Sequence, residues 1–157
     1  MLATTHAIVA GTIAAHTQNP VTAISLSFFS HFVLDAIPHW DFGTDWRKRS
    51  KGMTGVIAIA DTVMGFVLGI LLFKNVVPFP LLCIVIAVSM LPDWMEAPWY
   101  IFFAAPKKKE PGKKAGFLEK LCFGIYKTEN AIHSKTTFPF GVLTQFAAIA
   151  FFLVLLA

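Results

Sequence analysis

The chain has 157 residues, of which 56% are hydrophobic and 14% are charged, and its formal net charge is +4. An average soluble domain has roughly 25% charged residues, and a disordered chain combines low hydrophobicity with high charge, so the composition excludes both classes. The two cysteines are too few for a disulfide framework and lack the spacing of a metal site. The sequence therefore predicts a small all-α integral membrane protein.

Apolar segments that predict helices lie at residues 3–16, 21–38, 55–73, 79–105 and 137–157. About 20 apolar residues span a bilayer as an α-helix. We therefore expect residues 1–157 to form a single helical membrane domain, a bundle of about five transmembrane helices. Because proline disrupts the interior of a helix, we expect the fourth helix to be broken at Pro92-Asp93.

Basic residues gather in two predicted loops, 42–54 and 106–135. Since cytoplasmic loops carry an excess of Lys and Arg, we expect both loops and the N-terminus on the cytoplasmic side of a prokaryotic-type inner membrane, with the C-terminus outside. The longer loop includes Lys107, Lys108, Lys109 and Lys135, which we expect to bind anionic lipid head groups. No module of a size suited to nucleic acid is present, so membrane lipids are the expected partners.

Ionisable residues inside a bilayer are costly and usually functional. The predicted topology places His6, His31, Asp35, His39, Asp41, Asp61, Asp93 and His133 in one layer near the cytoplasmic side. Each has a structural explanation when taken alone: a histidine can bond a backbone carbonyl, and Asp93 can cap a helix. Separate structural roles for each residue do not explain why all of them lie in one layer. The shared layer therefore predicts a site that binds metal ions or transfers protons.

The residues expected to bind metal are His6, His31, Asp35, His39, Asp93 and His133. Positions 31, 35 and 39 follow the i, i+4, i+8 spacing of one helix stripe. Imidazole and carboxylate ligands without thiolate suit a divalent transition metal, Zn foremost, with Mn and Fe as alternatives. The set is larger than one zinc ion needs, which leaves open two ions or one ion with an outer shell of hydrogen-bonding partners.

Four short motifs resemble, in order, those of the YdjM-like membrane-bound metal-dependent hydrolases. They are TTHAIVAG with His6, HFVLDAIPHWD with Asp35, His39 and Asp41, LPD with Asp93, and AIHSKTTF with His133. The resemblance extends over most of the chain through these motifs. It implies a helical membrane protein with a His/Asp metal site and hydrolase activity.

The expected activity is metal-dependent hydrolysis of a phosphoester or another lipid-linked bond, such as that of a phospholipid or an isoprenoid phosphate, at the cytoplasmic interface. A bound metal supplies hydroxide near neutral pH. Asp61 or Asp41 is the expected general base, and Lys135 is expected to stabilise an anionic leaving group.

Two other classes of function stay open from the sequence. The first is a small transporter or ion-binding membrane protein that uses the same polar residues, although transporters often show internal repeats and none is visible here. The second is a non-catalytic membrane module whose basic loop binds lipid or a partner. In that case only the charge of residues 106–135 matters, and His/Asp variants behave like the wild type.

Overall fold

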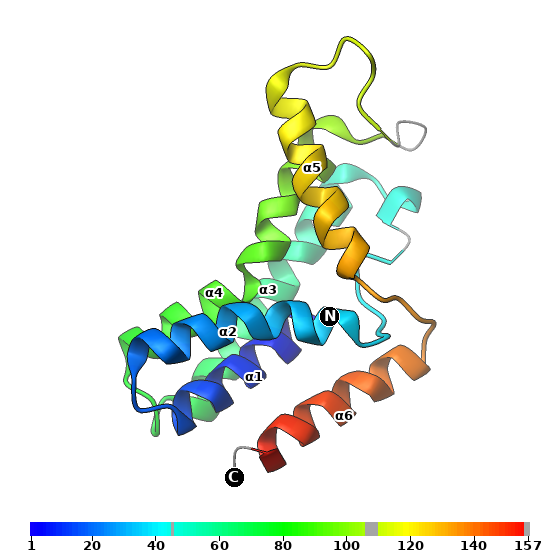
Figure 1. Ribbon diagram of the computed structural model, residues 1–157. Helices are drawn as coiled ribbons and strands as arrows, with labels where there is room; N and C mark the ends of the chain where they lie inside the picture. Colours follow the sequence, from blue (N-terminus) through cyan, green and yellow to red (C-terminus); the bar gives the residue numbers. More distant parts are fainter. Residues whose placement is uncertain (45, 106–109, 156–157) are drawn as a thin grey trace.

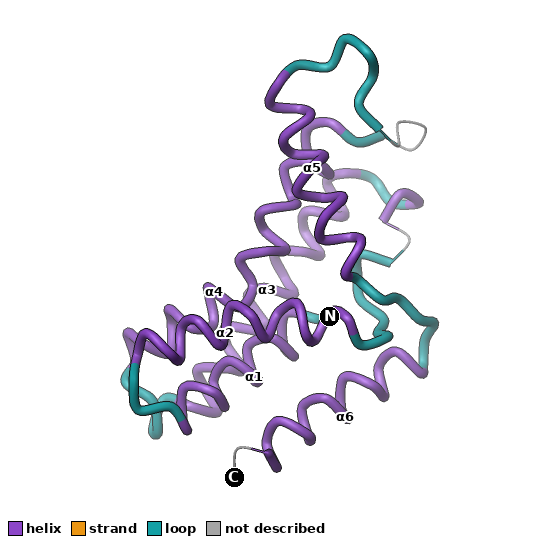
Figure 2. Tube along the Cα trace, viewed as in Figure 1, coloured by secondary structure: helices purple, strands orange, loops and turns teal. Residues whose placement is uncertain are grey.

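The computed structural model describes residues 1–44, 46–105 and 110–155, which fold into helices joined by short segments (Figure 1; helices purple and loops teal in Figure 2). The α-helices are α1 (Ala3–His16), α2 (Pro20–Ala36), α3 (Lys51–Phe73), α4 (Phe79–Pro98), α5 (Phe117–Ile132) and α6 (Phe140–Leu155). A short 3₁₀ helix covers Trp46–Lys48, and a π-helical turn covers Trp99–Phe103. These ranges contain no strand, so the predicted all-α class is confirmed.

Helix α1 lies at the centre of the packing and contacts α2, α3, α4 and α6. Small residues on α1 and α3 allow these two helices to pack closely. A Cβ at Gly65 of α3 would lie 2.9 Å from the backbone of Ala3, and a Cβ at Gly69 would lie 3.3 Å from the Cβ of Ala7. The two glycines therefore let α3 approach the first turns of α1, the part of the helix that carries His6.

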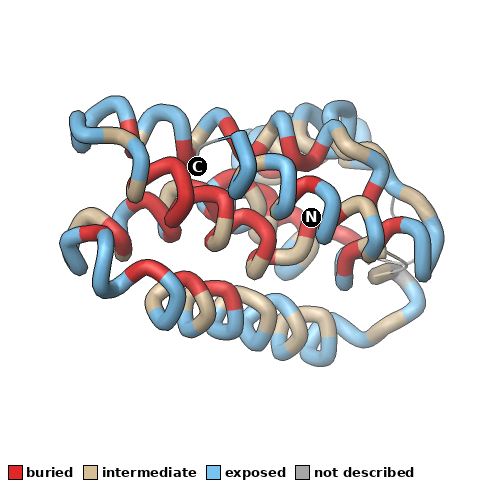
Figure 3. The backbone as a smooth tube through the Cα atoms, turned by 90° about the horizontal axis from the view of Figure 1, so that it is seen from below, coloured by how far each residue is buried: buried red, intermediate tan, exposed pale blue. Residues whose placement is uncertain are grey.

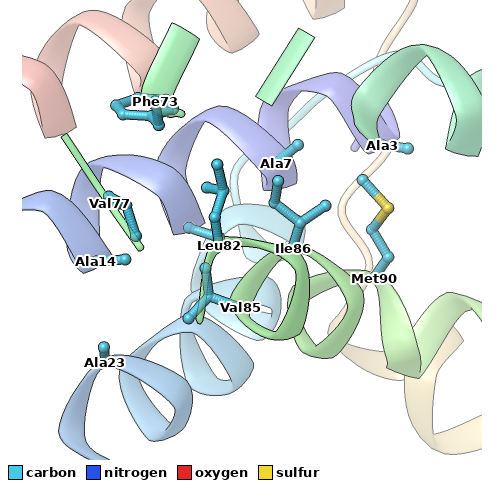
Figure 4. Close-up of a cluster of buried hydrophobic side chains, with 11 residues drawn as sticks. Ala3, Ala7, Ala14, Ala23, Phe73, Val77, Leu82, Val85, Ile86 and Met90 are labelled. Atoms are coloured by element: carbon cyan, nitrogen blue, oxygen red, sulfur yellow. The ribbon is translucent and has the colours of Figure 1, made fainter. Parts of the chain in front are cut away.

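The main apolar core lies between α1 and α4 (Figure 4). The alanines of α1 face the larger side chains of Leu82, Ile86 and Met90, which follow one another at one-turn spacing along α4. Seen from below, the buried residues gather on the inward faces of the helices, and the exposed residues lie outside (Figure 3). This packing brings the turn of α4 that follows Met90 close to the start of α1.

Two helical stretches are long and apolar enough to cross a membrane: α3, and α4 together with the π-turn, over Phe79–Phe103. Only Gly65, Gly69 and Phe73 of α3 are buried, so most of its apolar side chains face outward. Helices α2 and α6 are apolar but shorter, with 17 and 16 residues. Helix α1 is about 21 Å long, less than the hydrocarbon core of roughly 30 Å. The five-crossing bundle thus stays a prediction.

The predicted break of the fourth helix at Pro92-Asp93 is wrong, because α4 continues as an α-helix through Pro92 to Pro98. Pro92 is fully buried, so its packing offsets the backbone hydrogen bond that proline cannot make. The hydrogen-bond pattern changes directly after Pro98, in the π-turn, where the Ala104 N–H donates to the Trp99 carbonyl at 2.8 Å. The uninterrupted α4 keeps Asp93 in a fixed position on the helix.

The region 106–135, predicted as a basic loop, contains α5. On the inner face of α5, Cys122 and Phe123 pack with Trp99 of the π-turn and Tyr126. The exposed side of the helix carries lysines and other polar residues together with apolar side chains, among them Phe117, Leu118 and Leu121. Because polar residues are interspersed in this way, the segment is too polar on average to read as a membrane helix.

Candidate metal centre

The predicted metal ligands come together where the start of α1 meets α2, α4 and the segments that follow α2 and α5. They are His6 on α1, His31 and Asp35 on α2, His39 in the segment after α2, Asp93 on α4 and His133 directly after α5. The first four are buried, with 0–3% of their surfaces exposed. Asp93 and His133 are half-buried, so the site opens on their side.

Two groups of these residues have the geometry to hold a metal ion. His6, His31 and Asp93 form one group, and Asp35, His39 and His133 form the other; within each group the candidate ligand atoms lie within 4.8 Å of one another. Asp41 adjoins the second group, with its Oδ2 atom 3.2 Å from Nε2 of both His39 and His133. The sequence left open two ions or one ion with an outer shell of partners, and the two groups have room for the two-ion alternative.

Asp35 connects the two groups. Its Oδ1 atom lies 3.3 Å from Nε2 of His6, and its Oδ2 atom lies 3.2 Å from Nε2 of His31 and 3.4 Å from Nε2 of His133. The amino group of Met1 also contacts Oδ1. Asp35 would therefore hold an ion with His39 and His133, and its contacts with His6 and His31 join this group to the other.

Backbone carbonyls fix the protonation of two of the histidines. Nδ1 of His31 lies 2.7 Å from the Ser89 carbonyl, and Nδ1 of His39 lies 2.7 Å from the Ile37 carbonyl. Because a carbonyl only accepts hydrogen bonds, each Nδ1 carries the proton and donates it. In the neutral imidazole the lone pair is then on Nε2, which faces the other site residues in both cases. This is the arrangement of metal-bound histidines.

Several buried atoms of the cluster have no hydrogen-bond partner among the described residues. They are Nδ1 and Nε2 of His6, Nε2 of His31 and Oδ2 of Asp35. A buried polar atom without a partner costs about 1–3 kcal/mol, and such atoms are rare in folded proteins. These atoms belong to residues of the two ligand groups, so the residues present fit a cation.

Asp41 is held in place by the turn that follows it. Its Oδ1 atom accepts hydrogen bonds from the Thr44 backbone N–H at 2.7 Å and the Thr44 hydroxyl at 3.1 Å, while Oδ2 faces His39 and His133. Burial alone would raise the pKa of Asp41, but a hydrogen bond from His133 and the charge of Lys135 hold it well below its usual range. The carboxylate is therefore ionised and adjoins the second ligand group. Its predicted role as general base stays a prediction.

His39 was predicted on the same helix face as His31 and Asp35, but it lies in the extended segment after α2. Helix α2 ends at Ala36, and the extended segment that follows pairs with residues 134–136. The His39 N–H donates to the Ser134 carbonyl at 3.0 Å, and the Thr136 N–H donates to the His39 carbonyl at 2.9 Å. This short parallel pairing places His133 beside His39, with 3.0 Å between their Nε2 atoms.

Asp61 lies outside both ligand groups. Its Oδ2 atom accepts a hydrogen bond from the Ala3 N–H at 3.0 Å, and the residue lines the pocket beside the cluster. Its predicted role as general base therefore stays a prediction as well. Lys135 is exposed, and its Nζ atom lies 3.8 Å from Oδ1 of Asp41. The predicted lipid-binding residues Lys107, Lys108 and Lys109 lie outside the described residues.

Sequence reasoning missed two polar residues near the site. Gln145 of α6 is buried; its Oε1 atom accepts from the Leu2 N–H at 2.9 Å and the Thr5 hydroxyl at 3.0 Å, and its Nε2 atom donates to the Trp40 carbonyl at 2.7 Å. Glu129 of α5 has a pKa raised above its ordinary value by burial. An isolated glutamine in an otherwise apolar helix was a visible signal, whereas Glu129 lay in a segment taken for a loop.

A pocket of about 140 Å³ lies beside the cluster, between α3 and α4. Three site residues line it: Asp41, Asp93 and His133. Asp61, Glu96 and Lys135 also line it, together with apolar and aromatic residues of α3 and α4. The ligand atoms are thus reachable from one side, and that side is largely apolar.

Comparison of the chain with protein-family models, with curated proteins and with solved structures finds no match. The geometry of the cluster and of its pocket is therefore the basis for the function proposed next.

Proposed function

We propose that this chain is an integral membrane, metal-dependent hydrolase that cleaves a phosphoester of a lipid-linked substrate at the membrane interface. The observation that carries the proposal is the pair of His/Asp ligand groups joined through Asp35 and opening into a pocket between two apolar helices. Buried ligands with unpartnered atoms favour a cation, and the open side favours access for a substrate.

The apolar surface supports a location in the membrane. Large side chains on the outer faces of α3 and α6 are exposed, among them Val56 at 64% and Phe146 at 66%. Such an extensive apolar surface is unusual for a soluble monomer. A site reached between α3 and α4 suits a substrate that is itself dissolved in lipid.

The donor set suits Zn, with Mn and Fe as alternatives, because it combines imidazole and carboxylate without thiolate. When bound, such an ion supplies a water molecule of lowered pKa and a positive charge opposite the phosphate. His6, His31 and Asp93 would hold one ion and Asp35, His39 and His133 the other, with Asp41 beside the second.

The residues of the chain have separate tasks in this hydrolysis. Asp61, which lines the pocket without belonging to either ligand group, accepts the proton of the attacking water. The water oxygen bonds to phosphorus, the ester P–O bond breaks, and the leaving alcohol oxygen takes up the proton that Asp61 accepted from the water. Lys135 lies at the open side and stabilises the anionic groups. The Ser89 and Ile37 carbonyls keep His31 and His39 oriented.

The test is the metal content per chain of detergent-purified protein, measured by elemental analysis. A His31→Ala/Asp35→Ala variant is expected to lose the metal. His16→Ala is the matched control, because His16 is an exposed histidine at the far end of α1 from His6. Absence of stoichiometric metal in folded wild-type protein, after metal has been supplied, would overturn the proposal.

Hydrolysis is then measured with a water-soluble aryl phosphodiester and with phospholipid vesicles. The proposal expects turnover that a chelator abolishes and that added Zn restores. Metal binding without hydrolysis, accompanied by ion flux in proteoliposomes, would favour the ion-binding transporter instead. Unchanged behaviour of His/Asp variants would favour the non-catalytic membrane module.

A further inference from the structure

Acidic side chains dominate the wall of the pocket beside the metal centre. The carboxylates that line it are Asp41, Asp61, Asp93 and Glu96, and the basic side chains are Lys135 and His133. Nζ of Lys135 lies 3.8 Å from Oδ1 of Asp41, so these two charges compensate each other. Asp93 is assigned above to a metal ion. Asp61 and Glu96 remain, and neither forms an ion pair with a lysine or arginine of the described residues.

Glu96 is the more deeply buried of these two acids. It lies one turn after Asp93 on α4 and is 8% exposed. Its Oε1 atom accepts a hydrogen bond from the Tyr100 hydroxyl at 2.9 Å, whereas its Oε2 atom has no partner among the described residues. A protonated Oε2 would equally lack an acceptor. Because a buried carboxylate is costly unless charge or hydrogen bonds compensate for the lost water, Glu96 indicates a place for a cationic group in the pocket.

Aromatic rings form another part of the wall. Trp46, Trp94 and Tyr100 line the pocket, and the rings of Trp46 and Tyr100 lie edge to face with their centroids 4.6 Å apart. Nε1 of Trp94 donates to the Thr62 hydroxyl of α3 at 3.1 Å, which holds the indole across the space between the helices. Aromatic faces attract organic cations, most strongly where water is excluded. Calcium, in contrast, takes 6–8 oxygen ligands, so rings beside few carboxylates favour an alkylammonium group.

The position of the pocket suits an ammonium group that is attached to a phosphate at the metal centre. Asp93 and His133, one from each ligand group, line the same pocket, whose volume is about 140 Å³. Glu96 follows Asp93 by three residues, which is about 4.5 Å along the helix axis. A phosphate at the ligand groups and an ammonium group at Glu96 can therefore belong to one molecule with a short carbon link.

We propose that the pocket binds an alkylammonium group of the substrate between Glu96 and the rings of Trp94 and Tyr100, while the phosphate lies at the metal centre. This inference rests on the proposed function and adds the substrate class, a phosphodiester of an amino alcohol. The charge of the phosphate is compensated at the ligand groups, and the charge of the ammonium group is compensated in the pocket. Glu96 determines specificity and takes no part in breaking the ester bond.

The experiment compares two aryl phosphodiesters of the same shape, one of choline and one of the uncharged 3,3-dimethylbutyl alcohol. For the wild type, kcat/KM is expected to be at least about tenfold higher for the choline ester. In Glu96→Gln the two values are expected to approach each other. Glu110→Gln is the matched control, because Glu110 is an exposed glutamate that does not line the pocket. An ethanolamine ester shows which ammonium group is bound, and a preference for either over the neutral ester supports the proposal.

A binding measurement on the purified protein separates this inference from the proposed function. Choline is titrated and its methyl protons are followed by saturation-transfer NMR, with 3,3-dimethylbutanol as the uncharged probe. Weaker choline binding, by at least about tenfold in Kd, in both Glu96→Gln and Trp94→Leu supports the pocket even if no hydrolysis is found. Trp94 is 39% exposed, so its replacement leaves the buried core intact, and circular dichroism checks that both variants stay helical.

Two results would overturn the ammonium site. The first is equal binding of choline and 3,3-dimethylbutanol by the wild type. The second is hydrolysis with equal kcat/KM for the charged and the neutral ester, which would leave the metal-dependent hydrolase in place.

Discussion

The Nε2 atoms of His39 and His133 lie 3.0 Å apart, and Oδ2 of Asp41 lies 3.2 Å from both. The proton of His39 is on Nδ1, where it is donated to the Ile37 carbonyl. When the His39 ring is neutral, its Nε2 lone pair faces the Asp41 carboxylate in a buried place, and a cation or a second proton on the ring would stabilise this pair. The contact between His39 and His133, which are 94 positions apart, brings the second ligand group together.

Single substitutions are expected to separate the two ligand groups. His133→Ala removes a ligand from the second group only, so we expect metal content to fall from about two ions per chain to about one. Asp35→Ala removes the carboxylate between the groups and is expected to lower the occupancy of both. Elemental analysis with the His16→Ala control measures this. One ion per chain in the wild type would contradict the two-ion arrangement.

Asp61→Asn is expected to lower hydrolysis by about 10²–10⁴-fold without loss of metal. The asparagine oxygen still accepts the Ala3 N–H, so the start of α1 stays in place, but the amide cannot take a proton. Asp41→Asn is expected to reduce metal content as well, since Asp41 adjoins two imidazoles. Activity and metal content are measured on the same samples. Full activity of Asp61→Asn would exclude Asp61 as the base.

Gly141→Ala is expected to destabilise the protein by about 1–3 kcal/mol. A Cβ at Gly141 would lie 2.2 Å from the Trp40 nitrogen and 2.7 Å from the His39 carbonyl carbon, so α6 must move away from the segment that carries His39. Gly124→Ala is the control, because its Cβ meets nothing and alanine favours a helix by about 0.5–1 kcal/mol. Thermal unfolding in detergent should shift in opposite directions for the two variants.

Gln145→Leu is expected to cost about 1–3 kcal/mol and to weaken metal binding. The substitution leaves the Leu2 N–H, the Thr5 hydroxyl and the Trp40 carbonyl without their partner. Since these groups lie beside Ala3 and His39, the start of α1 and the segment after α2 lose a common anchor. Chemical denaturation and metal titration measure the two effects. Unaltered unfolding would show that these groups find other partners.

The helical class and most of the candidate site could be predicted because both depend on local patterns. Long apolar runs predicted α3 and α4 closely, and the one-turn spacing of His31 and Asp35 placed both on one face of α2. Polar residues in apolar segments are costly wherever they occur. This cost alone was sufficient to predict His6 and Asp93 as functional residues.

The remainder depends on contacts between distant segments, which spacing does not reveal. Helix α2 stops at Ala36, so His39 reaches the site through its pairing with residues 134–136 rather than as the next turn of the helix. Helix α5 was missed because polar residues are interspersed with its apolar ones and its partner, Trp99, lies elsewhere in the sequence. Pro92 was taken as a break because its burial could not be foreseen.

The close contact of α1 and α3 has a consequence for assembly in lipid. Acyl chains are as apolar as leucine, so helices in a bilayer gain little from hiding apolar surface and associate mainly through van der Waals contact. Gly65 and Gly69 provide such contact with Ala3 and Ala7. In the membrane protein proposed above, a bulky residue at either glycine would therefore displace the helix that carries His6, and the chain would remain helical while the proposed metal centre lacked one of its histidines.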